Sequence, residues 1–447
     1  MTRGRPTLDQ LRIEVEAGTV DTVVLGFTDM QGRLQGKRLA AEYFLADVLD
    51  NAAEGCNYLL AVDVEMNTVG GYAMSSWDRG YGDFVLRPDL ATLHRIPWHP
   101  GSVGLLADLE WPDGSPVVAS PRQILTVQTA RLAERGWQAF AGTELEFIVF
   151  SESYEDAWRA GYRDLTPVNQ YNVDYSLLGT ARVEPLLRGI RLGMAGAGLT
   201  VESAKGECNL GQHEIAFRYD EVRTACDHHS IYKNGAKEIA AQQGVSLTFM
   251  AKVNEREGNS CHIHLSLRDA SGRPVFADEP AVFDHFLAGL LAHLAELTLL
   301  FAPNVNSYKR FVAGSFAPTA VAWGRDNRTC ALRVVGHGAG LRVENRVPGA
   351  DVNPYLACAA MLVAGLDGID RELPLEEPCT GNAYASDAPR VPATLREARA
   401  AFAGSELARA AFGDEVVAHY LNAADVELAA FDAAVTDWER FRGFERL

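Results

Sequence analysis

From residue 121 onward, the spacing of apolar residues predicts helices and strands in mixed order. Residues 121–137 start with Pro121 and carry apolar residues at helical spacing, and residues 141–150 then alternate as in a strand. Further helices are predicted over 183–198, 221–243, 280–301 and 353–366, and further strands over 246–252, 262–268, 330–335 and 341–346. The segment from residue 394 to the end is again helical in pattern. This order is typical of an α+β fold.

The first hundred residues have a different pattern, of short strands and turns. The segment TVVLGFTDMQGRLQGKRL, residues 22–39, predicts a strand, a turn containing glycine and a second strand. Residues 86–117 are punctuated by proline and glycine. We therefore predict two domains, residues 1–112 and residues 113–447.

Composition narrows the function classes. Hydrophobic residues make up 47% and charged residues 22% of the 447 residues, which is typical of a globular protein. The formal net charge of −18 argues against nucleic acid and anionic membranes as partners. No apolar run is long enough to suggest a membrane span or a signal peptide. The seven cysteines are scattered and form no C-x-x-C motif, which favours a reducing cytoplasm.

The first candidate chemistry is a pair of glutamates in the predicted strand AGTELEFIVF. Glu144 and Glu146 are two positions apart, so both side chains leave the same face of the strand, about 6.6 Å apart. Like charges on a buried strand repel and are costly to desolvate. The pair lies either on a solvent-facing edge or beside bound cations.

Three later segments add similar side chains. KGECNLGQHEIAF contains Glu207 and Glu214, and GNSCHIHLSL places His262 and His264 on one face of a strand. Glu344 lies between Arg342 and Arg346. Taken singly, the two histidines are typical of core residues with satisfied hydrogen bonds or of surface residues. Glu344 between two arginines is typical of a surface ion-pair cluster. Taken together, so many carboxylate oxygens favour Mg²⁺ or Mn²⁺ over zinc.

Arginines form a separate group within residues 310–346. Their guanidinium forks recognise carboxylates and phosphates in a bidentate manner. An arginine cluster beside a cation site is the arrangement that phosphoryl transfer needs. The group comprises Arg310, Arg325, Arg328, Arg333, Arg342 and Arg346.

The motifs ELEF, GECNLGQHEI, GNSCHIHLSL, NRTCALRVV, ENRVPGADVNPYLACAAMLVAGLDGI and VTDWERFRGFE occur in order along the chain. Together they closely resemble the class I glutamine synthetase family. The resemblance implies a small N-terminal β-grasp domain and a large catalytic domain with a curved antiparallel sheet flanked by helices. It also implies a dodecamer of two hexameric rings, with each active site shared between neighbouring subunits. In this family ATP phosphorylates the γ-carboxylate of glutamate, and an amine attacks the acyl phosphate.

The resemblance also implies roles for individual residues, with about two or three Mg²⁺ or Mn²⁺ ions in each site. Glu146, Glu207 and Glu214 would bind one ion, and Glu144, His262 and Glu344 another. Gly258, Arg310 and Arg346 would bind glutamate. His264, Arg328, Arg333 and Arg342 would contact ATP and its phosphates, with Arg328 also a catalytic residue. Asp63 aligns loosely with the family's ammonium-binding aspartate, which has a catalytic role.

Two departures from the family pattern bear on the amine. Where ammonia-using members carry a glutamate on a flap over the amine pocket, KRFVAGSFAPTA has Phe316. A glutamate can attract ammonium and accept its proton, whereas phenylalanine offers an apolar wall. Glu65 adds a carboxylate near Asp63, which suits a cationic amine.

The sequence therefore predicts an ATP-dependent ligase that joins glutamate to a primary amine, namely a polyamine such as putrescine, spermidine or spermine, or ethanolamine. Three alternatives stay open. The protein could be an ordinary glutamine synthetase using ammonia, a non-catalytic regulatory member of the family, or a ligase of another acid, although the retained Arg310 and Arg346 argue against the last.

Overall fold

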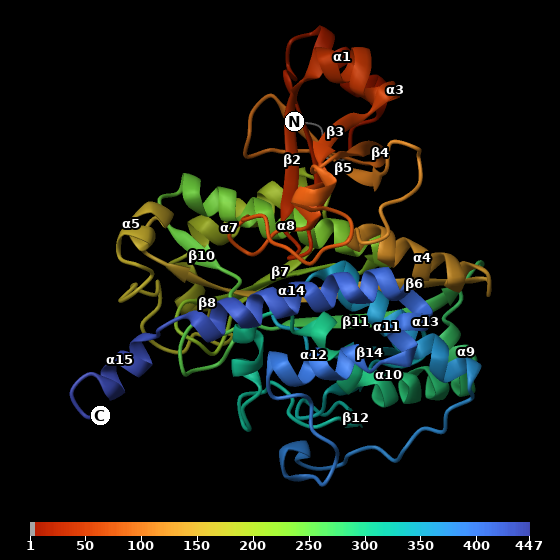
Figure 1. Ribbon diagram of the computed structural model, residues 1–447, viewed down its shortest axis with the longest axis vertical. Coiled ribbons are helices and arrows are strands. Elements are labelled where there is room, and N and C mark those ends of the chain that lie inside the picture. Colours follow the sequence, from red (N-terminus) through yellow and green to blue (C-terminus); the bar gives the residue numbers. More distant parts are fainter. Residues whose placement is uncertain (1–4) are drawn as a thin grey trace.

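The computed structural model describes residues 5–447 and confirms the predicted α+β class. Figure 1 shows a small N-terminal lobe standing on one end of a larger body of sheet and helices. Each part is built around its own sheet, and most of the buried apolar residues of the small lobe form a cluster separate from the main core. The active-site residues predicted from the catalytic motifs all lie in the larger body.

The small lobe contains a five-stranded sheet of order β2-β1-β5-β4-β3, in which β1 is antiparallel to β2 and parallel to β5. The predicted strand–turn–strand segment forms β1 and β2. The strands are β1 Thr22–Thr28, β2 Leu34–Ala40, β3 Ala53–Cys56, β4 Asp83–Arg95 and β5 Ser102–Glu110, and the helices are α1 Leu8–Glu16, α2 Ala41–Tyr43 and α3 Leu49–Asn51.

The expectation of only strands and turns in this region was wrong for α1. Thr7 and Gln10 form a reciprocal capping box that starts the helix, and Leu11 is fully buried in the core of the lobe. A nine-residue helix with a single fully buried side chain gives little helical periodicity, so capping and tertiary contact determine its structure more than pattern does.

The large sheet has β6 at its centre. The strand order is β12-β13-β14-β11-β6-β8-β7, and β9 and β10 also pair with β6. Neighbouring strands are antiparallel, except that β12 and β13 are parallel. The strands are β6 Trp137–Phe150, β7 Val201–Gly206, β8 Gln212–Phe217, β9 Asp220–Glu221, β10 Ser246–Thr248, β11 Cys261–Asp269, β12 Trp323–Arg325, β13 Leu332–Val335 and β14 Arg342–Asn345. The strand predicted over 246–252 is therefore shorter than expected.

Helices surround this sheet (Figure 1). The four helices predicted over 183–366 are present as α7, α8, α10 and α11, and the C-terminal segment is helical as predicted. The helices are α4 Pro121–Ala133, α5 Tyr154–Arg159, α6 Leu177–Ala181, α7 Glu184–Gly196, α8 Val222–Gln242, α9 Val275–Asp278, α10 Pro280–Phe301, α11 Pro354–Asp370, α12 Leu395–Ala403, α13 Glu406–Phe412, α14 Asp414–Ala433 and α15 Asp437–Gly443.

Helix α10 has the length and apolar composition of a membrane-spanning helix, yet 61% of its most apolar window is buried inside the protein. It packs along α11, whose side chains are almost all buried. We interpret α10 as a core helix of the large body.

One buried arginine joins the two parts of the molecule. Arg122, in the first turn of α4, contacts Asp89 of β4 at 2.6 Å and Asp108 of β5 at 2.5 Å. The same guanidinium contacts Asp227 of α8 through two bonds of 3.0 Å. Asp227 also accepts a hydrogen bond of 2.6 Å from the Tyr355 hydroxyl. One cation thus links the small sheet to two helices of the large body.

Candidate active site

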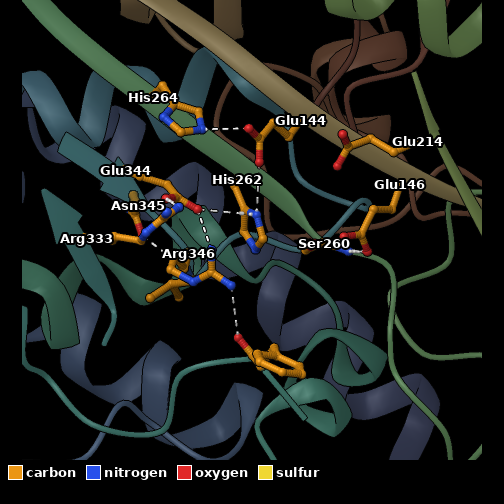
Figure 2. Close-up of polar contacts among 12 residues, drawn as sticks. Glu144, Glu146, Glu214, Ser260, His262, His264, Arg333, Glu344, Asn345 and Arg346 are labelled. Atoms are coloured by element: carbon orange, nitrogen blue, oxygen red, sulfur yellow. Dashed lines mark hydrogen bonds and ion pairs between the residues drawn. The ribbon is translucent and has the colours of Figure 1, made fainter. Parts of the chain in front are cut away.

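Strand pairing brings the predicted acidic and basic side chains to one face of the large sheet. Glu146 on β6 lies opposite Glu214 on β8, and Glu144 lies opposite His262 on β11. Farther along the sheet, Glu344 on β14 lies opposite both His264 on β11 and Arg333 on β13. Residues directly opposite across an antiparallel pair share a face, so five strands contribute side chains to the same region (Figure 2).

All of these side chains except His264 line a cavity of about 390 Å³. Glu146 and Glu344 are buried and Glu144 is partly buried, so the solvent-edge alternative for the first pair and the surface ion-pair alternative for Glu344 were both wrong. Of the predicted residues, the cavity walls include Glu144, Glu146, Glu207, Glu214, Gly258, His262, Arg310, Phe316, Arg328, Arg333, Glu344 and Arg346.

The first group suited to a cation consists of Glu146, Glu207 and Glu214, whose ligand atoms all lie within 4.8 Å of one another. Glu146 is fixed by hydrogen bonds to its Oε2 from the Ser260 backbone amide, at 2.7 Å, and from the Gln212 side chain, at 3.0 Å. Three converging carboxylates fit a hard divalent cation, whose charge would offset their repulsion.

The second group comprises Glu144, His264 and Glu344, again with ligand atoms within 4.8 Å of one another. His262 lies between the two carboxylates, with Nδ1 at 3.3 Å from Glu144 Oε2 and 3.5 Å from Glu344 Oε1. Figure 2 shows both imidazoles directed at Glu144. Either histidine can therefore share a cation with these carboxylates. His262 has that role in the family pattern, and the geometry also makes His264 available.

Burial and neighbouring charges shift the ionisation of these groups in opposite directions. Burial, together with the surrounding carboxylates, raises the pKa of Glu214 to about 8, despite the opposing effect of Lys205. Burial also opposes charge on Glu344, but His262 and Arg346 outweigh it and lower its pKa to about 2. Burial and the charge of Arg346 lower the pKa of His262, which favours the neutral imidazole that binds metal.

Arginines surround the inner part of the cavity. Arg346 forms a tight ion pair with Glu344, and Arg333 contacts the other oxygen of Glu344 at 2.7 Å. The Nε of Arg346 is buried and has no hydrogen-bond partner within residues 5–447. Arg310 is also buried, with Nη1 donating to the Val347 carbonyl at 2.9 Å. An unpaired guanidinium nitrogen beside a second buried arginine fits a carboxylate ligand.

Gly258 lies against Arg310, and the backbone leaves no room there for a side chain. A Cβ at this position would come within 2.4 Å of the Ala251 carbonyl oxygen and 2.6 Å of Arg310 Cγ. Arg328 is exposed at the mouth of the same cavity.

A second cavity, of about 310 Å³, shares Glu144 with the first. It is lined by His264 and Arg342, and Arg342 Nε donates a hydrogen bond of 3.1 Å to His264 Nδ1. Phe140 and Tyr219 also line it. Two of the four residues predicted to contact ATP therefore line this second cavity, which Arg310 and Arg346 do not line.

Asp63 and Glu65 do not join these cavities within one chain. Asp63 accepts hydrogen bonds from the backbone amides of Glu65, at 2.9 Å, and Asn67, at 2.8 Å, and it lines a different pocket beside α14. Glu65 is exposed. Phe316, in contrast, lines the central cavity, and its carbonyl accepts a long hydrogen bond of 3.4 Å from Arg346.

Several residues of the cavity were not predicted. Gln212 and Ser260 lie within the recognised motifs, and a search for polar neighbours of the glutamates would have found them. Lys205, which forms a tight ion pair with Glu207, lies in the same motif. Asp174 and Tyr175 come from an irregular segment between α5 and α6, where no sequence period indicates a site.

Comparison with known proteins identifies the family of this chain. Residues 118–442 match the family model for the glutamine synthetase catalytic domain. The chain is 68% identical, over 98% of its length and 96% of the relative, to a gamma-glutamylethanolamide synthetase of Streptomyces coelicolor. It is 37% identical, over 97% of each chain, to a glutamate–isopropylamine ligase of a Pseudomonas species.

Among solved structures, a GmaS–ADP complex superposes with a TM-score of 0.86 at 27% identity, covering 97% of this chain and 99% of that one. Because the family model covers well over half of the chain and two curated relatives exceed 30% identity over nearly its full length, the protein belongs to the glutamine synthetase family.

Proposed function

We propose that this ATP-dependent ligase joins ethanolamine to the γ-carboxylate of L-glutamate by way of γ-glutamyl phosphate. The observation that carries the proposal is the position of Phe316, which lines the same cavity as the paired Arg310 and Arg346. An apolar wall beside a carboxylate-binding pair favours an alkyl amine over ammonium. Among primary amines we propose ethanolamine, because the 68% identical relative is named as a gamma-glutamylethanolamide synthetase.

In this proposal glutamate binds at Gly258, Arg310 and Arg346, where the unpaired Arg346 Nε meets a carboxylate oxygen. The nucleotide binds in the second cavity, and its phosphates extend past His264 and Arg342 toward Arg333 and Arg328. Arginine side chains there stabilise the negative charge that develops on the transferred phosphoryl group.

Two groups of side chains would bind divalent cations, which neutralise the phosphate oxygens during transfer. Glu146, Glu207 and Glu214 form the first group, and Glu144, Glu344 and His262 form the second, with His264 close enough to contribute. The cations are Mg²⁺ or Mn²⁺, since carboxylate oxygens predominate among the ligands.

We further propose that Asp63 and Glu65 act in the active site of a neighbouring subunit, since both lie outside the central cavity of their own chain. This requires a homo-oligomer, for which the family resemblance suggests a dodecamer of two hexameric rings. We place the enzyme in the cytoplasm, where its seven free cysteines remain reduced.

An amine panel tests the choice of substrate. Purified protein with ATP, Mg²⁺ and glutamate is offered ammonium, methylamine, isopropylamine, ethanolamine, putrescine or spermidine, and phosphate release is measured. We expect the highest kcat/KM with ethanolamine. Faster turnover with ammonium than with every organic amine would identify an ordinary glutamine synthetase, and ATP binding without phosphate release would favour a regulatory protein.

Phe316→Glu is expected to increase the use of ammonium, because a carboxylate at this position can attract the cation and accept its proton. The measurement is the ratio of kcat/KM for ammonium to that for ethanolamine, which should rise by about tenfold or more, as one well-placed interaction of ~1.4 kcal/mol would produce. Phe316→Leu, which keeps an apolar wall, is the matched control. A folded Phe316→Glu protein with an unchanged ratio would refute the role of this side chain.

A further inference from the structure

We propose that Asp174 binds the ammonium group of the incoming amine and accepts its proton. The inference rests on the proposed function and deepens it by naming the group that activates the nucleophile. Asp174 belongs to an irregular segment before α6 and lines the central cavity. Neither the sequence motifs nor the family pattern described above assign it a role.

The carboxylate of Asp174 is available for a cation. Within residues 5–447 no ion pair neutralises it, and its only side-chain partner is the Cys208 thiol, whose Sγ lies 3.5 Å from Oδ2. One of its oxygens lies within 4.8 Å of a carboxylate oxygen of Glu207. A protonated amine entering the cavity therefore meets an unpaired negative charge next to the first cation group.

The ring of Tyr175 strengthens the case for a cation at this position. The Lys205 ammonium lies 4.9 Å from the ring centroid, so the face of the ring is already turned toward a primary ammonium group. Aromatic faces attract cations through their quadrupole. An alkylammonium substrate has the same charged group as this lysine, and its carbon chain would contact the ring.

Backbone strain marks the same region. Tyr175 has φ of 53° and Phe316 has φ of 60°, both in the left-handed region that bulky residues rarely adopt. Such conformations cluster at functional sites. Both residues line the central cavity and arise from segments far apart in the sequence. Two aromatic residues with left-handed backbone conformations therefore line the same cavity as Asp174.

In the proposed function, the same cavity also holds the electrophile. Arg346, only 4% exposed, lines the cavity with its Nε unpaired, and we place the glutamate carboxylate there. The γ-glutamyl phosphate then lies in the same cavity that Asp174 lines with its solvent-exposed carboxylate. The cavity, at about 390 Å³, is large enough for a glutamyl group and a small amine.

The proton balance of the step requires such a base. Ethanolamine is protonated at neutral pH and has no free lone pair on nitrogen. Asp174 accepts one proton from the ammonium group, and the freed lone pair attacks the γ-carbonyl carbon of γ-glutamyl phosphate. The C–N bond forms, the C–O bond to phosphate breaks, phosphate leaves with the electron pair, and the second proton on nitrogen passes to solvent.

Asp174→Asn tests the proposal, with hydroxylamine as the discriminating nucleophile because it is largely uncharged at neutral pH and needs neither the anion nor the base. With ethanolamine, kcat/KM should fall by about 100-fold or more, the usual contribution of a general base. With hydroxylamine, phosphate release and hydroxamate formation should stay near wild type. Asp156→Asn, an exposed aspartate outside the cavity, is the matched control and should leave both activities unchanged.

The remaining outcomes separate this inference from the proposed function. Absence of ethanolamine turnover in the wild-type enzyme contradicts the proposed function itself. Retained ethanolamine turnover in Asp174→Asn overturns the inference, as does an equal loss with both nucleophiles, which indicates damage to the phosphorylation step. A raised Mg²⁺ requirement in the variant, measured by titration, would make Asp174 a metal ligand and also overturn the inference.

Discussion

Replacing Glu344 with glutamine is expected to reduce ethanolamine ligation by about 1,000-fold, since loss of a cation-binding carboxylate removes several kcal/mol of transition-state stabilisation and each ~1.4 kcal/mol is tenfold in rate. Glu344 is fully buried and contacts Arg333, Arg346 and His262. It therefore serves the cation group and also fixes two arginines that we place around glutamate and phosphate. Phosphate release at saturating Mg²⁺ and glutamate measures the effect.

The same substitution should also lower the free energy of unfolding, because the buried Arg346 loses its anion and the partly buried Arg333 keeps only its pair with Asp326. Breaking a buried ion pair by removing one partner typically costs about 3–5 kcal/mol. Chemical denaturation of Glu344→Gln and of Glu155→Gln, an exposed glutamate on α5, provides the comparison. A Glu344→Gln protein with wild-type turnover would contradict the assignment of β14 to the catalytic centre.

The second large effect concerns the joint between the two parts of the molecule. Arg122→Met should destabilise the protein by about 3–5 kcal/mol, since methionine keeps the apolar stem but leaves the buried Asp227 without its cation. The partly buried Asp89 loses its closest cation and keeps the more distant Arg223, at 3.7 Å. Burial opposes the charge of Arg122, but Asp227 and other anions outweigh it and raise its pKa, so the guanidinium stays charged throughout the usual pH range.

Thermal unfolding and hydrogen exchange would detect this change, and exchange should increase first along β4 and β5. Arg396→Met is the matched control, because the Arg396–Asp432 ion pair lies on the surface, where such pairs contribute about 0–1 kcal/mol. Equal stability of the two variants would show that Arg122 does not join the lobe to the body.

The large expected cost of both substitutions reflects a common feature of the fold. Glu344 and Arg122 each lie at a junction where several elements meet, and each satisfies charges contributed by more than one of them. In a low-dielectric interior an unpaired charge is far more costly than an unpaired surface charge.

Local sequence patterns were sufficient for the parts of the site that lie within single strands. Alternation along residues 141–150 placed Glu144 and Glu146 on one face, and the same period placed His262 and His264 together, because a strand has a fixed repeat of two residues. Helices α7, α8, α10 and α11 were predictable for a similar reason, since their apolar spacing or long apolar runs extend over three or more turns.

Only the tertiary structure decided which of these strands lie side by side. The pairing of β6 with β8 brings Glu146 to Glu214, and that of β11 with β14 brings His264 to Glu344, although about 70 residues or more separate the partners in each case. Asp174 enters the cavity from an irregular segment, and Asp63 is excluded from the cavity of its own chain. Sequence periodicity records local backbone geometry, whereas these contacts depend on long-range strand register and loop conformation.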